Sequence, residues 1–111
     1  MYKVVASPAF KASLKRFRYF LENKYSKKLA ADTVKTIRQK IELNLEQNPK
    51  IAPVSDRLIE LGINRYRQYT IDEHNLVFYR VDEKEKTVLL LAVMDSRQSV
   101  EKVLFEVMVL V

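Results

Sequence analysis

The stretch Asn75–Arg97, NLVFYRVDEKEKTVLLLAVMDSR, decides the fold of this 111-residue chain. Its two apolar runs, Leu76 to Val81 and Thr87 to Met94, are rich in residues that favour strands, and the charged link Asp82 to Lys86 resists burial. This pattern predicts a β-hairpin. The unbroken apolar run Val88 to Met94 also predicts a strand covered on both faces, because a half-solvated strand would alternate between apolar and polar residues.

Upstream of the hairpin, the sequence predicts a short strand that leads directly into a helix. Tyr2 to Ala6 (YKVVA) is β-branched, and Ser7-Pro8 suits a helix start, because Ser caps free N–H groups and Pro lacks one that would stay unused. The apolar residues that follow are spaced by four and three, which places them on one helical face. They are Phe10, Leu14, Phe17, Leu21 and Tyr25.

A second amphipathic helix is expected after a break at Asn23 to Ser26, where Ser26 can cap it, and Asn48-Pro49 should end it. Its buried side should carry Ala30, Val34, Ile37, Ile41 and Leu45. Two amphipathic helices with so short a link form an antiparallel hairpin, and each apolar stripe needs a partner. The strands can supply that partner.

The rest of the chain completes an α+β fold. Pro49 to Glu60 should be an irregular, mobile loop, Ile63 to Ile71 (INRYRQYTI) a strand, and Asp72 to Asn75 a turn into the central hairpin. Ser99 to Val111 has helical spacing, although its last residues, VMVLV, equally suit a strand. The predicted order is β-α-α-β-β-β-α, a single domain over residues 1–111 in which the helical hairpin packs on a small, mostly antiparallel sheet.

The net charge of +6 is concentrated in the first part of the chain. Residues 1–60 hold thirteen basic and six acidic side chains, whereas residues 61–111 hold seven and eight. Such a field attracts polyanions or an acidic protein partner. It also suits a surface that only keeps the protein in solution.

Several classes of protein are excluded by composition. A single glycine, Gly62, rules out a P-loop or a GxGxxG dinucleotide motif, since both need several glycines. With no cysteine and a lone His74 in a polar turn, neither a metal site nor any other cofactor is expected. The chain shows no signal peptide and no apolar run long enough to span a membrane, so a cytoplasmic protein without membrane contact is expected.

Two places in the sequence carry candidate binding residues. Arg65, Arg67 and Tyr69 share one face of the predicted strand and could hold phosphates and stack on bases, although a solvated strand face also explains them. Arg97 follows a buried strand and precedes a helix, so it could contact a target or form an ion pair with Asp95 or Glu101. On the hairpin, Tyr79 should be core, and Arg80 should point away from the face of its neighbour Val81.

The order of elements resembles the RelE/ParE toxin superfamily of bacterial type II toxin–antitoxin modules. The likeness covers the whole chain through YKVVASPAFKASL, the Asn48-Pro49 end of the helical hairpin, NRYRQYTI, NLVFYRVD and VLLLAVMDSR, and its most specific part is Phe78 to Asp82 (FYRVD) with Arg97 after the next strand. The resemblance implies a toxin held in a complex by a cognate antitoxin. That antitoxin would wrap an amphipathic, acidic segment over the helical hairpin or the sheet.

The branches of this superfamily differ in chemistry. RelE-like members cut messenger RNA on the ribosome, which requires a base for the 2′-hydroxyl, cations for the phosphate and an acid for the leaving oxygen. The arginine that they place before the (V/I)xYxV pattern falls here on Leu76, and their tyrosine near the last helix falls on Val103. The resemblance therefore favours the ParE-like branch, whose members inhibit DNA gyrase and lack the nuclease side chains.

The target-binding residues expected for a ParE-like toxin are Arg65, Arg67, Tyr69, Arg80 and Arg97. Two alternatives remain open at this point. In a RelE-like endoribonuclease acting on ribosome-bound messenger RNA, Arg65, Arg67 and Arg97 would share the phosphate contacts, and a nonstandard group would supply the base. A degenerate toxin would serve only as an antitoxin-binding module.

Overall fold

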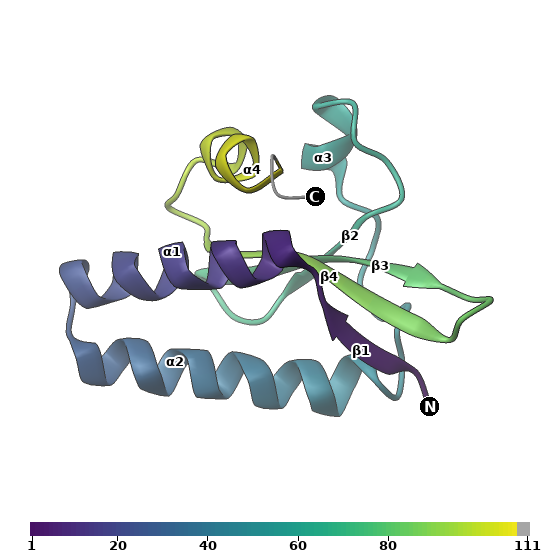
Figure 1. Cartoon of the computed structure of the whole chain (residues 1–111), viewed down its shortest axis with the longest axis horizontal. Coiled ribbons are helices and arrows are strands. Elements are labelled where there is room, and N and C mark those ends of the chain that lie inside the picture. Colours follow the sequence, from purple (N-terminus) through teal and green to yellow (C-terminus); the bar gives the residue numbers. More distant parts are fainter. Residues whose placement is uncertain (109–111) are drawn as a thin grey trace.

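The computed structural model describes residues 1–108 of the chain and the side chains of residues 1–105 (Figure 1). Its elements are β1 (Lys3–Ala6), α1 (Pro8–Lys24), α2 (Lys27–Lys40), a π-helical turn η1 (Ile41–Leu45), α3 (Asp56–Glu60), β2 (Arg67–Thr70), β3 (Asn75–Asp82), β4 (Thr87–Asp95) and α4 (Val100–Met108). The predicted α+β class and order of main elements are confirmed. The short helix α3 and the π-helical turn η1 were not predicted from the sequence.

The four strands form one mixed sheet in the order β1-β4-β3-β2. β1 runs parallel to β4, with Val4 opposite Val88, and the other two pairs are antiparallel, with Val77 opposite both Tyr69 and Val93. The predicted hairpin therefore supplies the two central strands. Its second strand is buried on both faces as expected, because every residue from Val88 to Met94 except Leu89 is buried.

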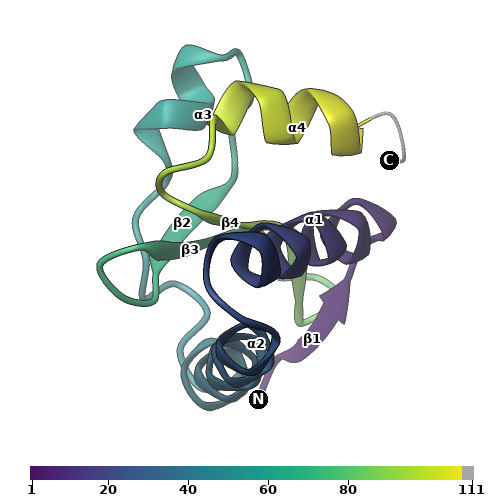
Figure 2. The same ribbon diagram turned by 90° about the vertical axis from the view of Figure 1, so that its left-hand side faces the viewer.

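Three helices enclose the sheet from different sides. Figure 2 shows α2 on one face, α4 on the other, and α1 alongside β4. The core between α2 and the sheet includes Phe17, Ile37 and Tyr79, and the core on the α4 face includes Phe78 and Leu104. The sheet is thus covered on both faces, which agrees with the apolar character of its central strands.

α1 also satisfies the edge of β4. β1 pairs with β4 only as far as Leu90, so the rest of that edge has no strand beside it. The buried hydroxyl of Ser13 on α1 accepts a hydrogen bond from the backbone N–H of Val93 at 2.9 Å and donates to the carbonyl of Phe10 at 2.8 Å. A buried strand edge therefore meets a side-chain acceptor in place of a strand.

Both long helices begin where the sequence predicts. The hydroxyls of Ser7 and Ser26 each accept a backbone N–H bond of 3.0 Å, and Pro8 is the first residue of α1. The predicted stripes are buried as far as Leu21 on α1 and through Leu45 at the end of the second helix, apart from a half-buried Leu14. Tyr25 is an exception, because it follows the end of α1 and is exposed.

Two predicted segments differ in extent. Pro49 to Glu60 was expected to be irregular, but its last five residues form α3, which Ser55 caps and the fully buried Leu58 anchors. The strand expected over Ile63 to Ile71 is reduced to β2, because Arg65 has a left-handed φ of 75° that interrupts the extended backbone. Side-chain periodicity could not show either feature.

The C-terminal segment is helical over Val100–Met108. Of the helix and the strand that the sequence allowed there, the helix is the one present over these residues. Residues 107 and 108 of the VMVLV sequence belong to this helix, and residues 109–111 lie outside the described part of the chain. Among the described helices, none combines the length and apolar character required to cross a bilayer.

Candidate functional site

The five arginines and tyrosines expected to bind a target do not form one cluster. Arg67 and Tyr69 share the face of the sheet that α2 covers, whereas Arg80 lies on the opposite face. Arg80 and Arg97 also lie near opposite ends of β3–β4: Arg80 is opposite Leu89, and Arg97 follows Asp95, whose partner is Asn75. The strand between these ends spans roughly 17 Å at ~3.4 Å per residue.

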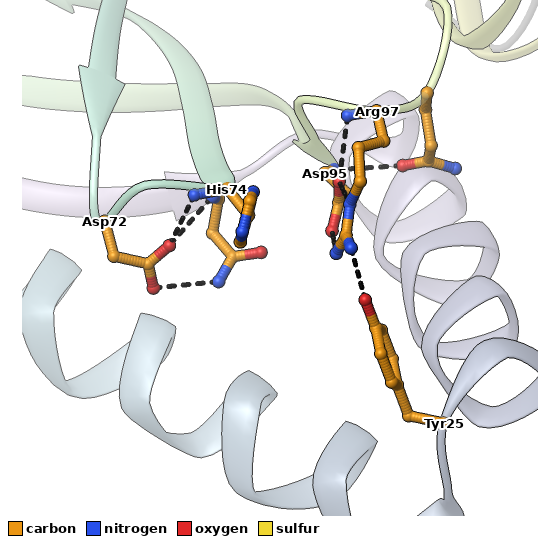
Figure 3. Close-up of polar contacts among 7 residues, drawn as sticks. Tyr25, Asp72, His74, Asp95 and Arg97 are labelled. Atoms are coloured by element: carbon orange, nitrogen blue, oxygen red, sulfur yellow. Dashed lines mark hydrogen bonds and ion pairs between the residues drawn. The ribbon is translucent and has the colours of Figure 1, made fainter.

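Arg97 is held at the corner between β4 and α4 (Figure 3). Asp95, the last residue of β4, has a side chain that is 0% exposed, and the turn after it returns Arg97 to that carboxylate. The backbone N–H and the Nε of Arg97 donate to Oδ1 of Asp95 at 2.8 and 2.7 Å, and its Nη2 donates to Oδ2. Of the two ion pairs considered for Arg97, the one with Asp95 is therefore present.

The same guanidinium also reaches the end of the first helix. Its Nη1 donates a hydrogen bond to the hydroxyl of Tyr25, the residue directly after α1 (Figure 3). Arg97, in the turn before α4, thus joins the end of β4 to the distant end of α1. Sequence reasoning missed this role of Tyr25, because helical spacing assigned the ring to the apolar stripe.

The electrostatics of this corner keep both partners charged. Burial alone would raise the pKa of the Asp95 carboxyl, but the hydrogen bonds and the charge of Arg97 outweigh it and leave that pKa below its ordinary value. Hydrogen bonds to Asp95 and Tyr25 in turn raise the pKa of Arg97. Both groups therefore stay charged near neutral pH, and the carboxylate of Asp95 balances the charge of Arg97.

A second polar turn lies beside this corner and carries His74 (Figure 3). Oδ1 of Asp72 accepts the backbone N–H groups of His74 and Asn75, both at 2.9 Å, and Oδ2 accepts the Asn75 amide at 2.9 Å. Burial opposes ionisation of Asp72, but these hydrogen bonds prevail and lower its pKa. His74 is exposed, and no trio of His, Cys, Asp and Glu able to hold a metal ion occurs among residues whose side chains are described.

Arg67 and Tyr69 on β2 form hydrogen bonds within the protein. Nη1 of Arg67 donates to the carbonyl of Ala52 at 2.6 Å, and the hydroxyl of Tyr69 accepts from the amide of Asn44 at 2.6 Å. These two residues share a face as predicted, but that face packs against α2. Arg65, expected on the same face, lies outside the strand and is exposed.

The hairpin residues have the expected orientations. Tyr79 is 0% exposed, and its hydroxyl donates to the carbonyl of Pro49 at 2.6 Å. Val81 packs on the α2 side, so its neighbour Arg80 lies on the α4 side, where its Nε is buried without a hydrogen-bond partner among the described residues. Leu76 and Val103, at the two nuclease positions of the RelE-like branch, are 4% and 2% exposed. Core positions of this kind cannot touch a substrate.

A groove of about 340 Å³ opens between β1, α1 and α2. Its lining is mainly apolar and includes Val4, Leu14 and Ile37, while Lys11 and Arg38 add positive charge. Two carboxylates, those of Glu42 and Glu46, complete the polar part of the lining. An amphipathic segment of a partner protein would match this combination of an apolar floor and charged edges.

Comparison with known proteins gives one family and a set of solved structures, two of which are described below. The family described as "ParE toxin of type II toxin-antitoxin system, parDE" matches residues 4–100. The toxin–antitoxin complex RelBE2 of Mycobacterium tuberculosis is 17% identical, with a TM-score of 0.54 over 85% of this chain and 96% of that chain. A metal-bound toxin from Helicobacter pylori is 22% identical, with a TM-score of 0.49 over 86% and 94% of the respective chains. No curated protein sequence matches this chain.

Proposed function

The chain belongs to the ParE toxin family of type II toxin–antitoxin systems, and from this premise we propose that it inhibits DNA gyrase by binding it and does not cut RNA. The observation that carries this proposal is the state of Arg97. Its Nε and Nη2 both donate to the carboxylate of Asp95, so the paired edge of the guanidinium that would grip a phosphate is already occupied, and its Nη1 donates to Tyr25.

The remaining candidate groups also support binding without RNA cleavage. Cleavage at the 2′-hydroxyl needs a base, an acid and cations around one phosphate. Arg80 is separated from Arg97 by roughly 17 Å of strand, and Arg67 bonds the carbonyl of Ala52. The positions at which the RelE-like branch carries its arginine and tyrosine are apolar and buried.

We place the cognate antitoxin in the groove between β1, α1 and α2. An amphipathic segment could bury its apolar side against Leu14 and Ile37, and its acidic side chains would find Lys11 and Arg38 at the edge. The resulting heteromeric complex would be the inactive form of the toxin, as in the type II systems to which the family belongs.

A supercoiling assay tests the action on gyrase. Purified toxin added to gyrase, ATP and relaxed plasmid should reduce the supercoiled product as its concentration rises, and toxin premixed with its antitoxin should have no effect. Relaxation of supercoiled plasmid by a type I topoisomerase serves as the control and should continue. Full supercoiling at saturating toxin would refute the proposal.

Primer extension on translated messages tests the enzymatic alternative, a RelE-like endoribonuclease. We expect no new message ends in cells or translating extracts that contain the toxin. Cuts within codons would show that the protein acts by the RelE-like mechanism. A chain that neither inhibits gyrase nor cuts messages, and does not slow growth when it is induced alone, would be an antitoxin-binding module only.

A further inference from the structure

The helical hairpin presents a surface of exposed cations, separate from the candidate target-binding residues on the sheet and at Arg97. We call this surface the basic face; it consists of Lys11, Lys15 and Arg18 on α1 and Lys27, Lys28, Lys35 and Arg38 on α2, all exposed. Helical spacing places three acidic residues, Glu22, Asp32 and Glu42, beside these cations on the two helices. The basic face therefore holds most of the excess charge found in residues 1–60.

The cations of the basic face form two neighbouring rows. Lys11, Lys15 and Arg18 follow one another at spacings of four and three, so they lie along one side of α1 over about 10 Å of helix. α2 runs back antiparallel beside α1 (Figure 1), and Arg38 lines the same groove as Lys11. Because packed helix axes lie roughly 8–10 Å apart, the two rows are side by side.

These cations have no carboxylate partners inside the described part of the protein. The ion pairs recorded among its side chains join Lys50 to Glu83 and Arg97 to Asp95, and none involves the basic face. Neighbouring like charges repel one another, and this repulsion would be relieved by an anionic partner. The basic face is thus electrostatically complementary to a polyanion.

The chemistry between the rows distinguishes the kind of polyanion. Protein interfaces have an apolar, often aromatic centre, and single-stranded nucleic acid is held by rings that stack on bases. Of the exposed apolar side chains near the rows, Ala31 is small and Tyr19 lies on the side of α1 turned away from α2. Tyr25 and Leu29 lie where the two helices join, and the guanidinium of Arg97 already lies over the ring of Tyr25. A charged surface with no stacking ring between its rows suits the phosphates of a duplex, whose bases stay paired.

We propose that the basic face binds the phosphate backbone of duplex DNA independently of sequence. This inference goes beyond the proposed inhibition of gyrase, because it concerns the toxin and DNA alone. Lys11 and Arg38 belong to both the basic face and the groove assigned to the antitoxin, so a bound antitoxin would also compete with DNA for these two side chains.

Fluorescence anisotropy with a labelled duplex of arbitrary sequence tests the inference without gyrase. The logarithm of the binding constant should fall linearly with the logarithm of salt, with a slope of about −0.9 per phosphate contacted. Contacts to about four phosphates would weaken binding roughly 100-fold for a fourfold rise in salt. The triple variant Lys15→Gln, Lys35→Gln and Arg38→Gln should bind at least about tenfold more weakly and show a shallower slope.

A matched triple variant separates a local surface from diffuse attraction by net charge. Lys3→Gln, Lys84→Gln and Lys102→Gln remove the same three charges from exposed positions away from the basic face, and this variant should keep the wild-type slope. Equal losses in the two triples, or no duplex binding near physiological salt, would overturn the proposal. A third outcome would also overturn the proposal. If the wild type bound polyglutamate more tightly than duplex DNA, and the Lys15, Lys35 and Arg38 variant lost that binding, the basic face would be assigned to an acidic protein.

Discussion

The arginines of the sheet and the cations of the helical hairpin differ in what they bind. Arg67 and Arg97 donate hydrogen bonds to the protein's own carbonyl and carboxylate oxygens, whereas Lys15 and Arg38 are exposed and take part in no ion pair recorded among the described side chains. The first group holds the fold together, and the second is available to a partner. A cation in the sequence indicates a binding surface only where the fold leaves its charge unsatisfied.

The largest effect on stability should come from removing the carboxylate at the β4–α4 corner. Asp95→Ala takes away a buried acceptor that serves the backbone N–H and the guanidinium of Arg97, and we expect the free energy of unfolding to fall by about 2–3 kcal/mol. Urea denaturation measures this loss.

Glu101→Ala is the matched control for this substitution. Glu101 is the other carboxylate that sequence reasoning considered as a partner of Arg97, and it is exposed on α4. Its removal should change the free energy of unfolding by less than about 0.5 kcal/mol. Equal losses for the two variants would mean that the corner does not depend on Asp95.

Acid should weaken the same corner. The pKa of Asp95 is lower in the folded protein than in the unfolded chain, so its contribution is complete above the unfolded pKa of about 4 and is lost as pH falls through the folded pKa. Thermal denaturation below about pH 4 should show this loss in the wild type. Asp95→Asn should have a flatter pH profile in that range, and identical profiles would contradict the assignment.

A smaller loss is expected at the loop before α3. Arg67→Met removes the 2.6 Å hydrogen bond to the carbonyl of Ala52 but keeps much of the aliphatic stem, and we expect a cost of about 1–2 kcal/mol. Limited proteolysis should show faster cleavage between residues 49 and 55. Arg57→Met, at an exposed position of α3, is the control and should leave both stability and cleavage unchanged.

The smallest effect on the free energy of unfolding is expected at the basic face. The triple substitution of Lys15, Lys35 and Arg38 by Gln should leave the free energy of unfolding within about 0.5 kcal/mol of the wild type, since surface changes away from special features have small effects. Its loss of duplex binding could then not be attributed to unfolding. A large destabilisation would mean that these cations, like Arg67 and Arg97, stabilise the fold.

Local signals in the sequence were sufficient for most of the fold. The apolar runs of the hairpin predicted the central strands, and Ser7, Pro8 and Ser26 predicted the helix starts, because strand burial and capping depend on neighbouring residues. Two features of the fold could not be predicted from the sequence, for the same physical reason. The left-handed backbone at Arg65 and the short helix anchored by Leu58 depend on distant packing that leaves no period in the sequence.

The candidate site was less predictable than the fold. Adjacent residues in β2 correctly indicated that Arg67 and Tyr69 share a face, but not that α2 covers it. The sequence offered Asp95 as one partner of Arg97, yet the contact with Tyr25 joins residues 72 positions apart. A long-range hydrogen bond of this kind depends on how α1 and β4 pack together.

The amino-acid sequence alone was enough to establish the element types, the central hairpin and the excess of positive charge near the N-terminus, because each depends on residue chemistry or local spacing. Only the folded chain decided which cations are satisfied. Arg97 is neutralised because the turn after β4 returns it to the carboxylate of Asp95, which the fold buries, and tertiary packing adds the end of α1, whereas Lys15 and Arg38 stay exposed because α1 and α2 turn these residues outward.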